Sequence, residues 1–448
     1  MIFTRPLKRQ LLPSLLTGLA LLLILGLGSS SSSNTLYKQK IHPTPSPTVT
    51  SLNIPSCRVL PCMIPGDTPG IAQFIDTWNN IHLFQSFDYS ISNPAIIAKH
   101  YDFVWGAAVS HVAAIRSGNS KIYSSYYIPF HRDNGLFSDN GAYHDLTYWK
   151  ANHPDWILYK CDRVTPAYEF GDPNMPLDFA NPTLVSWQIQ SYAQPASERG
   201  YDAIAADNVD LQNIYHACGV YIHGKWVQRY SGQLDDPQWR VDIVSWLARM
   251  QQALHQLRHP LALIPNLALG DLSPGDRLVQ QVVSHIDGVL DEDGFTNGAR
   301  GYLTGSSWVQ RIQFMESVQA QYKPYYVVNQ FQVHSISRDQ VQWALASYLM
   351  GKEHTSAVFI STYQEYGADT RYNEYNAQIG NPQDNLYQSQ NVYWRDYTNG
   401  LSIVNPDPGE TYEVTLRAGR KYIDLYGSPA GQTITLPPHS GIVLLTSS

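Results

Sequence analysis

Short apolar runs alternate along the middle of the chain with longer segments whose apolar residues recur at helical spacing. The short runs are rich in β-branched and aromatic residues, which is typical of buried strands. We expect strands at 81–87, 102–107, 121–128, 201–207, 261–266, 286–292, 325–331 and 356–362. Helices are expected between them, with the clearest patterns at 181–200, 237–258 and 337–351, where Asn181 and Ser337 suit the N-cap of the first and the last.

This order of elements predicts an α/β fold in which eight β-then-α units form a parallel (β/α)8 TIM barrel. A doubly wound open sheet is the alternative, and it is disfavoured because no Gly-rich phosphate loop follows the first strand. Two connections are unusually long, 129–200 between the third and fourth strands and 208–236 after the fourth. Long loops are usually functional, and insertions after barrel strands lie on the face where active sites form.

The pattern changes at both ends of the chain. Residues 390–448 alternate apolar and polar positions between Gly and Pro turns, which predicts a C-terminal β-sandwich domain. Packing against the barrel is its favoured role, and sugar binding is the alternative. Residues 1–28 place basic side chains before an apolar run and predict a signal peptide or an N-terminal membrane anchor. The Ser-, Thr- and Pro-rich residues 29–56 predict a linker, which leaves 57–389 for the barrel.

Charged residues are only 15% of the 448 residues and aromatic residues reach 12%, with 30 Tyr and 11 Trp. A surface poor in charge and rich in aromatic rings suits an uncharged, hydroxyl-rich ligand, although any single ring has core packing as its alternative. The net charge of −7 and the lack of a basic patch after residue 40 exclude nucleic-acid binding. Neither G-x-S-x-G nor H-E-x-x-H occurs, so serine hydrolase and zincin chemistry have no support, and we expect no cofactor.

Four cysteines form two candidate disulfides, a local one between Cys57 and Cys62 and a second between Cys161 and Cys218, one in each long connection. Four cysteines allow three connectivities, and free thiols remain an alternative. The spacing required for a zinc site is absent. Together with the N-terminal segment, the cysteines predict a protein that is secreted or anchored to the outer face of the cytoplasmic membrane.

Two of the expected strands, 201–207 and 286–292, are similar in pattern, and each ends in a carboxylate, Asp207 and Glu292. As the fourth and sixth strands of a barrel they flank the fifth, so both acids are expected to converge on one pocket. Two facing carboxylates are what glycoside hydrolysis needs, at about 5–5.5 Å for retention or about 6.5–9.5 Å for inversion of the anomeric configuration. The structural alternative is that these acids are helix caps or ion-pair partners.

Side-chain alternation selects Glu292 rather than its neighbour Asp291, although a β-bulge would reverse that choice. The acidic stretch DEDG also suits calcium, but the full EF-hand pattern is missing. HRDN at 131–134 resembles a kinase catalytic loop, but Ser138 stands where the loop needs Asn, and no Gly-rich loop exists. Polar and aromatic residues near strand ends are candidates for sugar binding: Asp88, Trp105, Tyr127, Asn208, Asn266, Asp291, Asn329 and Gln330.

Several stretches resemble the bacterial hypothetical glycosyl hydrolase family 15, (β/α)8 glycosidases related to the α-galactosidase-like group. They are YKCDRVTPAYEFGDPNMPLDFANP, LDFANPTLVSWQ, GYDAIAADNV and DGVLDEDGFTN. The resemblance covers residues 80–365 and implies a strand-four Asp nucleophile and a strand-six general acid/base, here Asp207 and Glu292. The sixth-strand match is the weaker one, because the wider group favours Asp there and this chain offers both residues.

The sequence therefore predicts a bacterial glycoside hydrolase that acts on an extracellular poly- or oligosaccharide. One alternative is a non-catalytic carbohydrate-binding surface protein on a degenerate barrel, which would keep the aromatic residues but tolerate loss of either acid. A carboxyl separation much above about 10 Å would favour that alternative. A structural envelope protein is the other alternative. The sequence predicts neither the sugar nor the oligomeric state.

Overall fold

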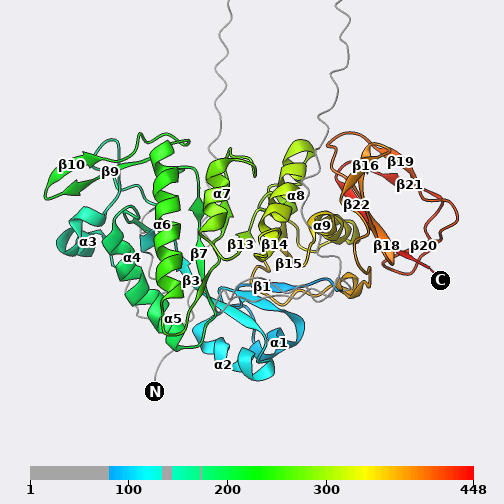
Figure 1. Ribbon diagram of the computed structural model, residues 1–448, viewed down its shortest axis with the longest axis horizontal. Coiled ribbons are helices and arrows are strands. Elements are labelled where there is room, and N and C mark those ends of the chain that lie inside the picture. The colour runs from blue at the N-terminus through cyan, green and yellow to red at the C-terminus, as the bar shows by residue number, and fades with distance from the viewer. Residues whose placement is uncertain (1–79, 134–143, 172–173, 448) are drawn as a thin grey trace, which may run out of the picture. The chain divides into compact units, whose positions relative to one another are not determined.

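The computed structural model describes residues 80–133, 144–171 and 174–447 (Figure 1). These residues belong to one compact unit, Cys57–Ser448. The expected signal or anchor, the linker and the Cys57–Cys62 pair lie outside the described residues. Within the described stretches, no helix combines the length and the apolar character that crossing a membrane requires.

The first parallel sheet brings together strands that are far apart in the chain. Its order is β1 (Phe84–Ser86), β2 (Phe103–Trp105), β3 (Tyr123–Pro129), β7 (Ala203–Asp207) and β11 (Ala262–Leu263). Each strand pairs in parallel with its neighbour, so all of their carboxyl ends lie at the same edge of the sheet. Asp207, the last residue of β7, is at this edge.

A second parallel sheet continues the first. Its order is β13 (Val289–Asp291), β14 (Tyr325–Phe331) and β15 (Ser356–Thr362). Isolated parallel bridges join the two sheets at both edges, from Leu83 to Val358 and from Asn266 to Leu290. The structure thus contains a strand at each of the eight expected places, and the mixed α/β fold is confirmed.

Helices connect the parallel strands. They are α1 (Ile97–His100), α2 (Val109–Gly118), α3 (Leu146–Asn152), α4 (Pro182–Gln188), α5 (Gln194–Glu198), α6 (Pro237–His255), α7 (Arg277–Ser284), α8 (Gly305–Gln319) and α9 (Arg338–Gly351). Helices α6, α8 and α9 pack against strands β11, β14 and β15 (Figure 1). In α6 the buried side chains recur at helical spacing, which is why this amphipathic segment folds against the sheet.

The predicted helix starts are confirmed at both N-caps. The Asn181 side chain accepts a hydrogen bond from the backbone of Thr183, and Ser337 forms a capping box with Gln340. The predicted helix 181–200 is interrupted, however, because a π-helical turn at Ile189–Ala193 separates α4 from α5. Pro195 lies just after this turn, and it has no N–H with which to continue a regular hydrogen-bond ladder.

Side chains alternate between an inner apolar cluster, to which both parallel sheets contribute, and an outer one beneath the helices. On β7, Ala203 and Ala205 belong to the inner cluster, and Asp207 continues that series. On β13, Leu290 is an inner residue, so the same period of two places Glu292 on the inner side and Asp291 on the outer side. The strand pattern therefore aims Asp207 and Glu292 toward the same interior.

The two long connections build a covering layer at the carboxyl ends of the strands. One antiparallel pair joins β4 (Arg132–Asp133) to β6 (Met175–Pro176). An antiparallel three-stranded sheet has β9 (Ala217–Ile222) between β5 (Tyr159–Lys160) and β10 (Lys225–Gln228). A further pair, parallel, joins β8 (Val209–Asp210) to β12 (Leu267–Ala268). Cys161 and Cys218 form a disulfide that links the two connections.

Removing this disulfide is expected to destabilise the protein. The bridge joins positions 57 residues apart. A cross-link of this kind reduces the number of conformations open to the unfolded chain and so stabilises the native state by about 2–4 kcal/mol. The Cys161→Ser/Cys218→Ser variant should therefore melt at a lower temperature than the wild type. Thermal unfolding with and without reductant measures this, and an equal effect of reductant on both proteins would contradict it.

The C-terminal residues form a five-stranded antiparallel sheet and a two-stranded one. The larger has the order β16 (Tyr387–Ser389), β17 (Val392–Tyr397), β18 (Gly400–Asn405), β22 (Ser440–Thr446) and β20 (Tyr422–Asp424), and the smaller pairs β19 (Tyr412–Thr415) with β21 (Thr433–Leu436). The two share an apolar cluster that includes Trp394 and Leu436.

The larger C-terminal sheet packs directly on α9. Arg395 on β17 is buried and donates hydrogen bonds to the carbonyl oxygens of Leu349 and Met350, at 3.0 and 2.9 Å. The Tyr397 hydroxyl donates to the Leu349 carbonyl at 2.6 Å. These donors satisfy carbonyl groups that the end of a helix leaves without intrahelical partners.

Candidate active site

A single amide connects the two candidate acids. Asn266, which follows β11, donates through Nδ2 to Asp207 Oδ1 at 2.9 Å and to Glu292 Oε2 at 2.6 Å. Because one nitrogen contacts both oxygens, these two lengths together limit the separation of the oxygens to 5.5 Å. The carboxyl ends of β7, β11 and β13 thus contribute one residue each to a compact group.

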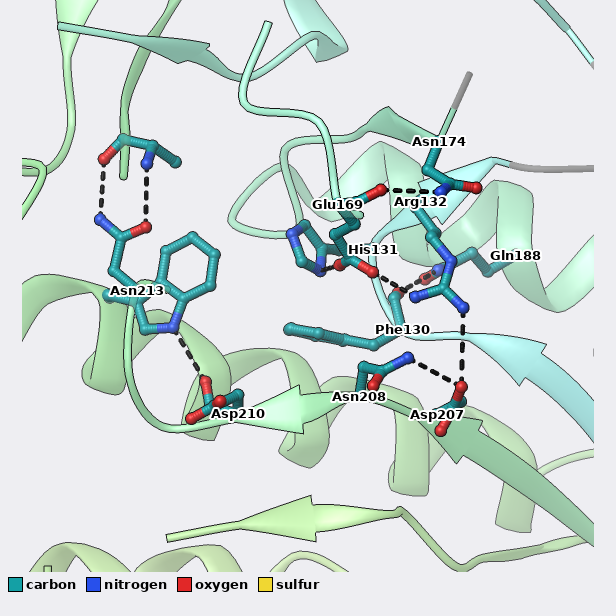
Figure 2. A network of polar contacts seen from close by, with 12 residues as sticks. Phe130, His131, Arg132, Glu169, Asn174, Gln188, Asp207, Asn208, Asp210 and Asn213 are labelled. Atoms are coloured by element: carbon teal, nitrogen blue, oxygen red, sulfur yellow. Dashed lines mark hydrogen bonds and ion pairs between the residues drawn. The ribbon is translucent and has the colours of Figure 1, made fainter. Parts of the chain in front are cut away.

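Asp207 is held mainly through one of its two oxygens. Oδ2 accepts hydrogen bonds from the Tyr127 hydroxyl and from Asn208 Nδ2, both at 2.7 Å, and lies 3.6 Å from Arg132 Nη2. Figure 2 shows the contacts of Asn208 and Arg132. Asn208 makes its contact from the left-handed backbone region, at φ 59°, which Asn tolerates better than most residues. Among these hydrogen bonds, Oδ1 accepts only the one from Asn266.

Glu292 has a different environment from Asp207. Burial and the nearby Asp207 carboxylate raise the pKa of Glu292 to about 7, against the opposing effect of hydrogen bonds from Asn266 and Tyr366. The Tyr366 hydroxyl is in turn held by the Ser86 hydroxyl at 2.7 Å. Glu292 is therefore partly protonated near neutral pH, which is the state that a general acid needs.

Two other predicted sugar-binding residues, Trp105 and Asp88, are buried near the carboxyl end of the first parallel sheet. Trp105 donates its indole N–H to the Ile264 carbonyl at 3.1 Å and makes an edge contact with the Tyr127 ring, within the inner cluster. Asp88 is buried and accepts from the Ala108 backbone at 2.8 Å. Both residues support the carboxyl end of the sheet, and neither makes a hydrogen bond to Asp207 or Glu292 in the structure.

Asp291 and Asn329 lie on the outer side of their strands. Asp291 pairs with Arg311 of α8 and accepts from the Tyr325 hydroxyl at 2.7 Å. Asn329 accepts from the backbone N–H of Phe295 at 3.0 Å. Their positions agree with the alternation on β13 and β14, whereas Gln330 falls in the inner series with Val328.

The structure adds contacts that the strand pattern did not predict. Arg132, the second residue of the HRDN stretch, contacts Asp207 through Nη2, and its Nη1 atom pairs with Glu169 (Figure 2). Tyr366, which follows β15, contacts Glu292. Arg132 lies three residues after Pro129, where β3 ends, and a basic residue so close to the end of a strand was the available signal for it.

No group of three or more His, Cys, Asp or Glu side chains suited to a metal ion occurs in the stretches that the structure describes. In the DEDG stretch, Asp291 is paired with Arg311, and Asp293 lies 3.0 Å from Arg300. The two aspartates that were candidates for calcium binding therefore form ion pairs with arginine side chains.

Comparison with known proteins gives one family match. The family described as hypothetical glycosyl hydrolase family 15 matches residues 123–401. No curated protein matches the chain.

Solved structures are similar only at low identity. An α-amylase from Malbranchea cinnamomea has a TM-score of 0.44 and 12% identity, covering 82% of this chain and 97% of its own. The Flavobacterium johnsoniae GH31 dextranase complexed with glucose has 0.44 and 11%, covering 85% and 54%. A cycloalternan-degrading enzyme from Trueperella pyogenes, in complex with isomaltose, has 0.42 and 10%, covering 86% and 63%.

Proposed function

Because this chain belongs to the hypothetical glycosyl hydrolase family 15, we propose that it cleaves O-glycosidic bonds with Asp207 as nucleophile and Glu292 as general acid/base. The observation that carries the proposal is the Asn266 amide that contacts both carboxylates. It limits the two contacted carboxylate oxygens to a separation of at most 5.5 Å, which is compatible with the short carboxyl separation of about 5–5.5 Å that a covalent, retaining mechanism uses. An inverting mechanism uses a longer carboxyl separation of about 6.5–9.5 Å to leave room for a water, so the shared contact to Asn266 favours the retaining alternative.

In the first step, protonated Glu292 gives its proton to the glycosidic oxygen while Asp207 Oδ1 attacks the anomeric carbon. The bond to the leaving group breaks, and a glycosyl ester forms on Asp207. In the second step, ionised Glu292 takes a proton from water, which attacks the same carbon and releases Asp207. The sugar leaves with its original anomeric configuration, and both carboxyl groups return to their starting states.

The fold proposed for this chemistry is a closed (β/α)8 barrel. The parallel bridges at both edges of the two sheets support it, as does the inner cluster that both sheets share. In such a barrel the catalytic residues lie at the carboxyl ends of several strands. Asp207, Asn266 and Glu292 follow β7, β11 and β13, which agrees with that arrangement.

The test is hydrolysis of a panel of bacterial and plant polysaccharides and oligosaccharides by the full-length protein. We expect release of sugar, and proton NMR should show that the first anomer formed has the configuration of the substrate. Inversion would contradict the covalent mechanism. Binding without turnover, unchanged in Asp207→Asn, would favour the carbohydrate-binding alternative. Secretion or anchoring remains a prediction from the N-terminal segment.

Phe170 is proposed to bind a sugar ring next to the reacting bond. Its side chain is 64% exposed, and the Arg132 guanidinium lies 5.4 Å from the centre of its ring. A sugar that covers an exposed aromatic face removes apolar surface from water. We expect Phe170→Ala to raise KM by about tenfold and to change kcat less. Val164→Ala, an exposed residue of the same connection, is the control and should leave KM unchanged.

A further inference from the structure

We propose that Arg132 and Glu169 act as a pair of positioning residues for the nucleophile. Arg132 holds Asp207 by its Oδ2 atom, and Glu169 offsets the Arg132 charge so that the carboxylate remains reactive. This inference rests on the proposed function, because it assigns roles relative to Asp207 as nucleophile.

The guanidinium of Arg132 connects three groups. Its Nη2 atom donates to the Tyr127 hydroxyl at 3.1 Å. The same atom lies 3.6 Å from Asp207 Oδ2, while Nη1 pairs with Glu169 Oε2 (Figure 2). The Tyr127 hydroxyl itself donates to Asp207 Oδ2. Arg132 therefore contacts Asp207 both directly and through Tyr127, and both contacts fall on the oxygen that does not attack.

Glu169 is fixed on the far side of Arg132. Its Oε1 atom lies 2.7 Å from His131 Nδ1, and its backbone carbonyl accepts from Asn174 Nδ2 at 2.7 Å (Figure 2). The side chains of His131, Arg132 and Glu169 are 3%, 6% and 1% exposed. Such a buried carboxylate needs a specific reason to be charged, because water does not stabilise it.

The charges of this pair are permanent at ordinary pH. Burial raises the pKa of Glu169, but His131 and Arg132 outweigh burial and hold it below its usual range. Burial lowers the pKa of Arg132, and Glu169, Tyr127 and Asp207 more than reverse that change. Arg132 is therefore cationic and Glu169 anionic throughout the range in which a glycosidase is assayed.

The need for Glu169 follows from the change in charge at Asp207. The nucleophile is an anion before it attacks and a neutral ester afterwards. A nearby cation stabilises the anion more than the ester and so opposes the attack. Glu169, in contact with the same guanidinium, reduces that preference while leaving the Arg132 hydrogen-bond donors in place.

Other titratable groups that face Asp207 come from four further elements. They are Tyr127 on β3, Glu292 after β13, Tyr366 after β15 and Tyr215 after β8. Burial raises the pKa of each tyrosine, so these three remain neutral in the assay range. Arg132 and Glu169 are thus permanent charges beside the nucleophile, and Glu292 titrates.

The test is the pH profile of kcat/KM for Arg132→Met and for the isosteric Glu169→Gln, in full-length protein. The acid limb reports the ionised nucleophile, and the alkaline limb reports protonated Glu292. We expect the acid limb to move up by about one pH unit in Arg132→Met and down by a similar amount in Glu169→Gln. Both variants should lose kcat, and the alkaline limb should move less than the acid limb.

Two further variants separate this role from a structural one. Arg132→Lys keeps the charge and should keep the acid limb in its wild-type position despite a lower kcat. Arg229→Met is the matched control, because Arg229 forms a similar pair with Asp178 at 2.8 Å in the same covering layer. It should leave both limbs in place. If Arg132→Met fails to fold, Glu169→Gln and Arg132→Lys still provide the comparison.

The outcomes are distinct. One outcome is that Arg132→Met and Glu169→Gln fold but are less active by the same factor at every pH, with both limbs unmoved. This result would overturn the inference. The proposed function would remain intact if Asp207→Asn is inactive. An active Asp207→Asn, or a wild type that hydrolyses no substrate of the panel, would overturn both. Acid limbs that shift in opposite directions would support the inference.

Discussion

Asp207→Asn is expected to lower kcat at least about a thousandfold, because an amide cannot attack the anomeric carbon and form the glycosyl ester. The substitution is nearly isosteric, and the oxygen of the new amide can still accept from Tyr127 and Asn208, whereas its nitrogen would face the Asn266 donor. Steady-state kinetics on the substrate found in the panel measures the loss. A smaller variant, Asp207→Gly, should regain turnover with azide and yield a glycosyl azide of inverted configuration.

The control for this experiment is an acid at the other end of the same strand. Asp202 precedes β7 and pairs with Arg116 at 2.7 Å, away from the catalytic edge. Asp202→Asn should lose stability but keep a kcat near that of the wild type. If Asp207→Asn retains kcat within about tenfold of the wild type while remaining folded, the nucleophile has been assigned to the wrong residue.

Glu292→Gln is expected to remove the alkaline limb of the pH profile and to lower kcat/KM by about a thousandfold on natural glycosides. The raised pKa of about 7 means that wild-type kcat/KM should fall as the pH rises through that value. Substrates with an activated aryl leaving group need no proton and should be cleaved nearly as well by the variant. A uniform loss on both kinds of substrate would contradict the acid role.

Asp293→Asn is the matched control for this variant. Its charge is one of the causes that raise the pKa of Glu292, so its removal should move the alkaline limb to lower pH without abolishing activity. The thermal stability of Glu292→Gln gives a second readout that does not depend on substrate.

The direction of that stability change follows from the two pKa values. The Glu292 carboxyl titrates near 4.5 when the chain is unfolded and at about 7 when it is folded. Its favourable contribution to folding is fully present below 4.5 and is lost as the pH rises through about 7. Glu292→Gln should therefore melt at a higher temperature than the wild type at pH 8, with a smaller difference at pH 4. Equal melting temperatures at pH 8 would indicate that Glu292 is not buried beside a second charge.

The strand periodicity explains why the sequence located the two acids. Ala203 and Ala205 of β7 point inward, so the period of two also places the Asp207 side chain inward. Leu290 of β13 points inward in the same way, which predicts that Glu292 does too. The rule also shows why Asp291, one residue away, pairs outward with Arg311. A local period of two was sufficient for these predictions, and the structure contains no bulge that reverses the choice at β13.

The partners of the acids were harder to predict, because they depend on distant contacts. Arg132 and Glu169 are 37 residues apart, and they meet through the pairing of β4 with β6 within an irregular connection. Tyr366 reaches Glu292 from beyond the last parallel strand. No helical or strand period relates such residues, so only the folded connections show which side chains they bring to the site.

The contact between α9 and the C-terminal sheet has a consequence for the inheritance of these parts. Every residue from Val341 to Gly351 is buried, although a surface helix would normally leave one face in water. At Gly441 on β22, an added side-chain carbon would lie 2.7 Å from the Ala346 side chain, so the sheet and the helix are fitted to each other at close range. A genetic crossover between α9 and the C-terminal sheet would combine a helix from one parent with a sheet from the other, and their contacting side chains would no longer fit. We expect functional chimaeras of homologous proteins to exchange α9 and the C-terminal sheet as one block, with breakpoints before Ser337.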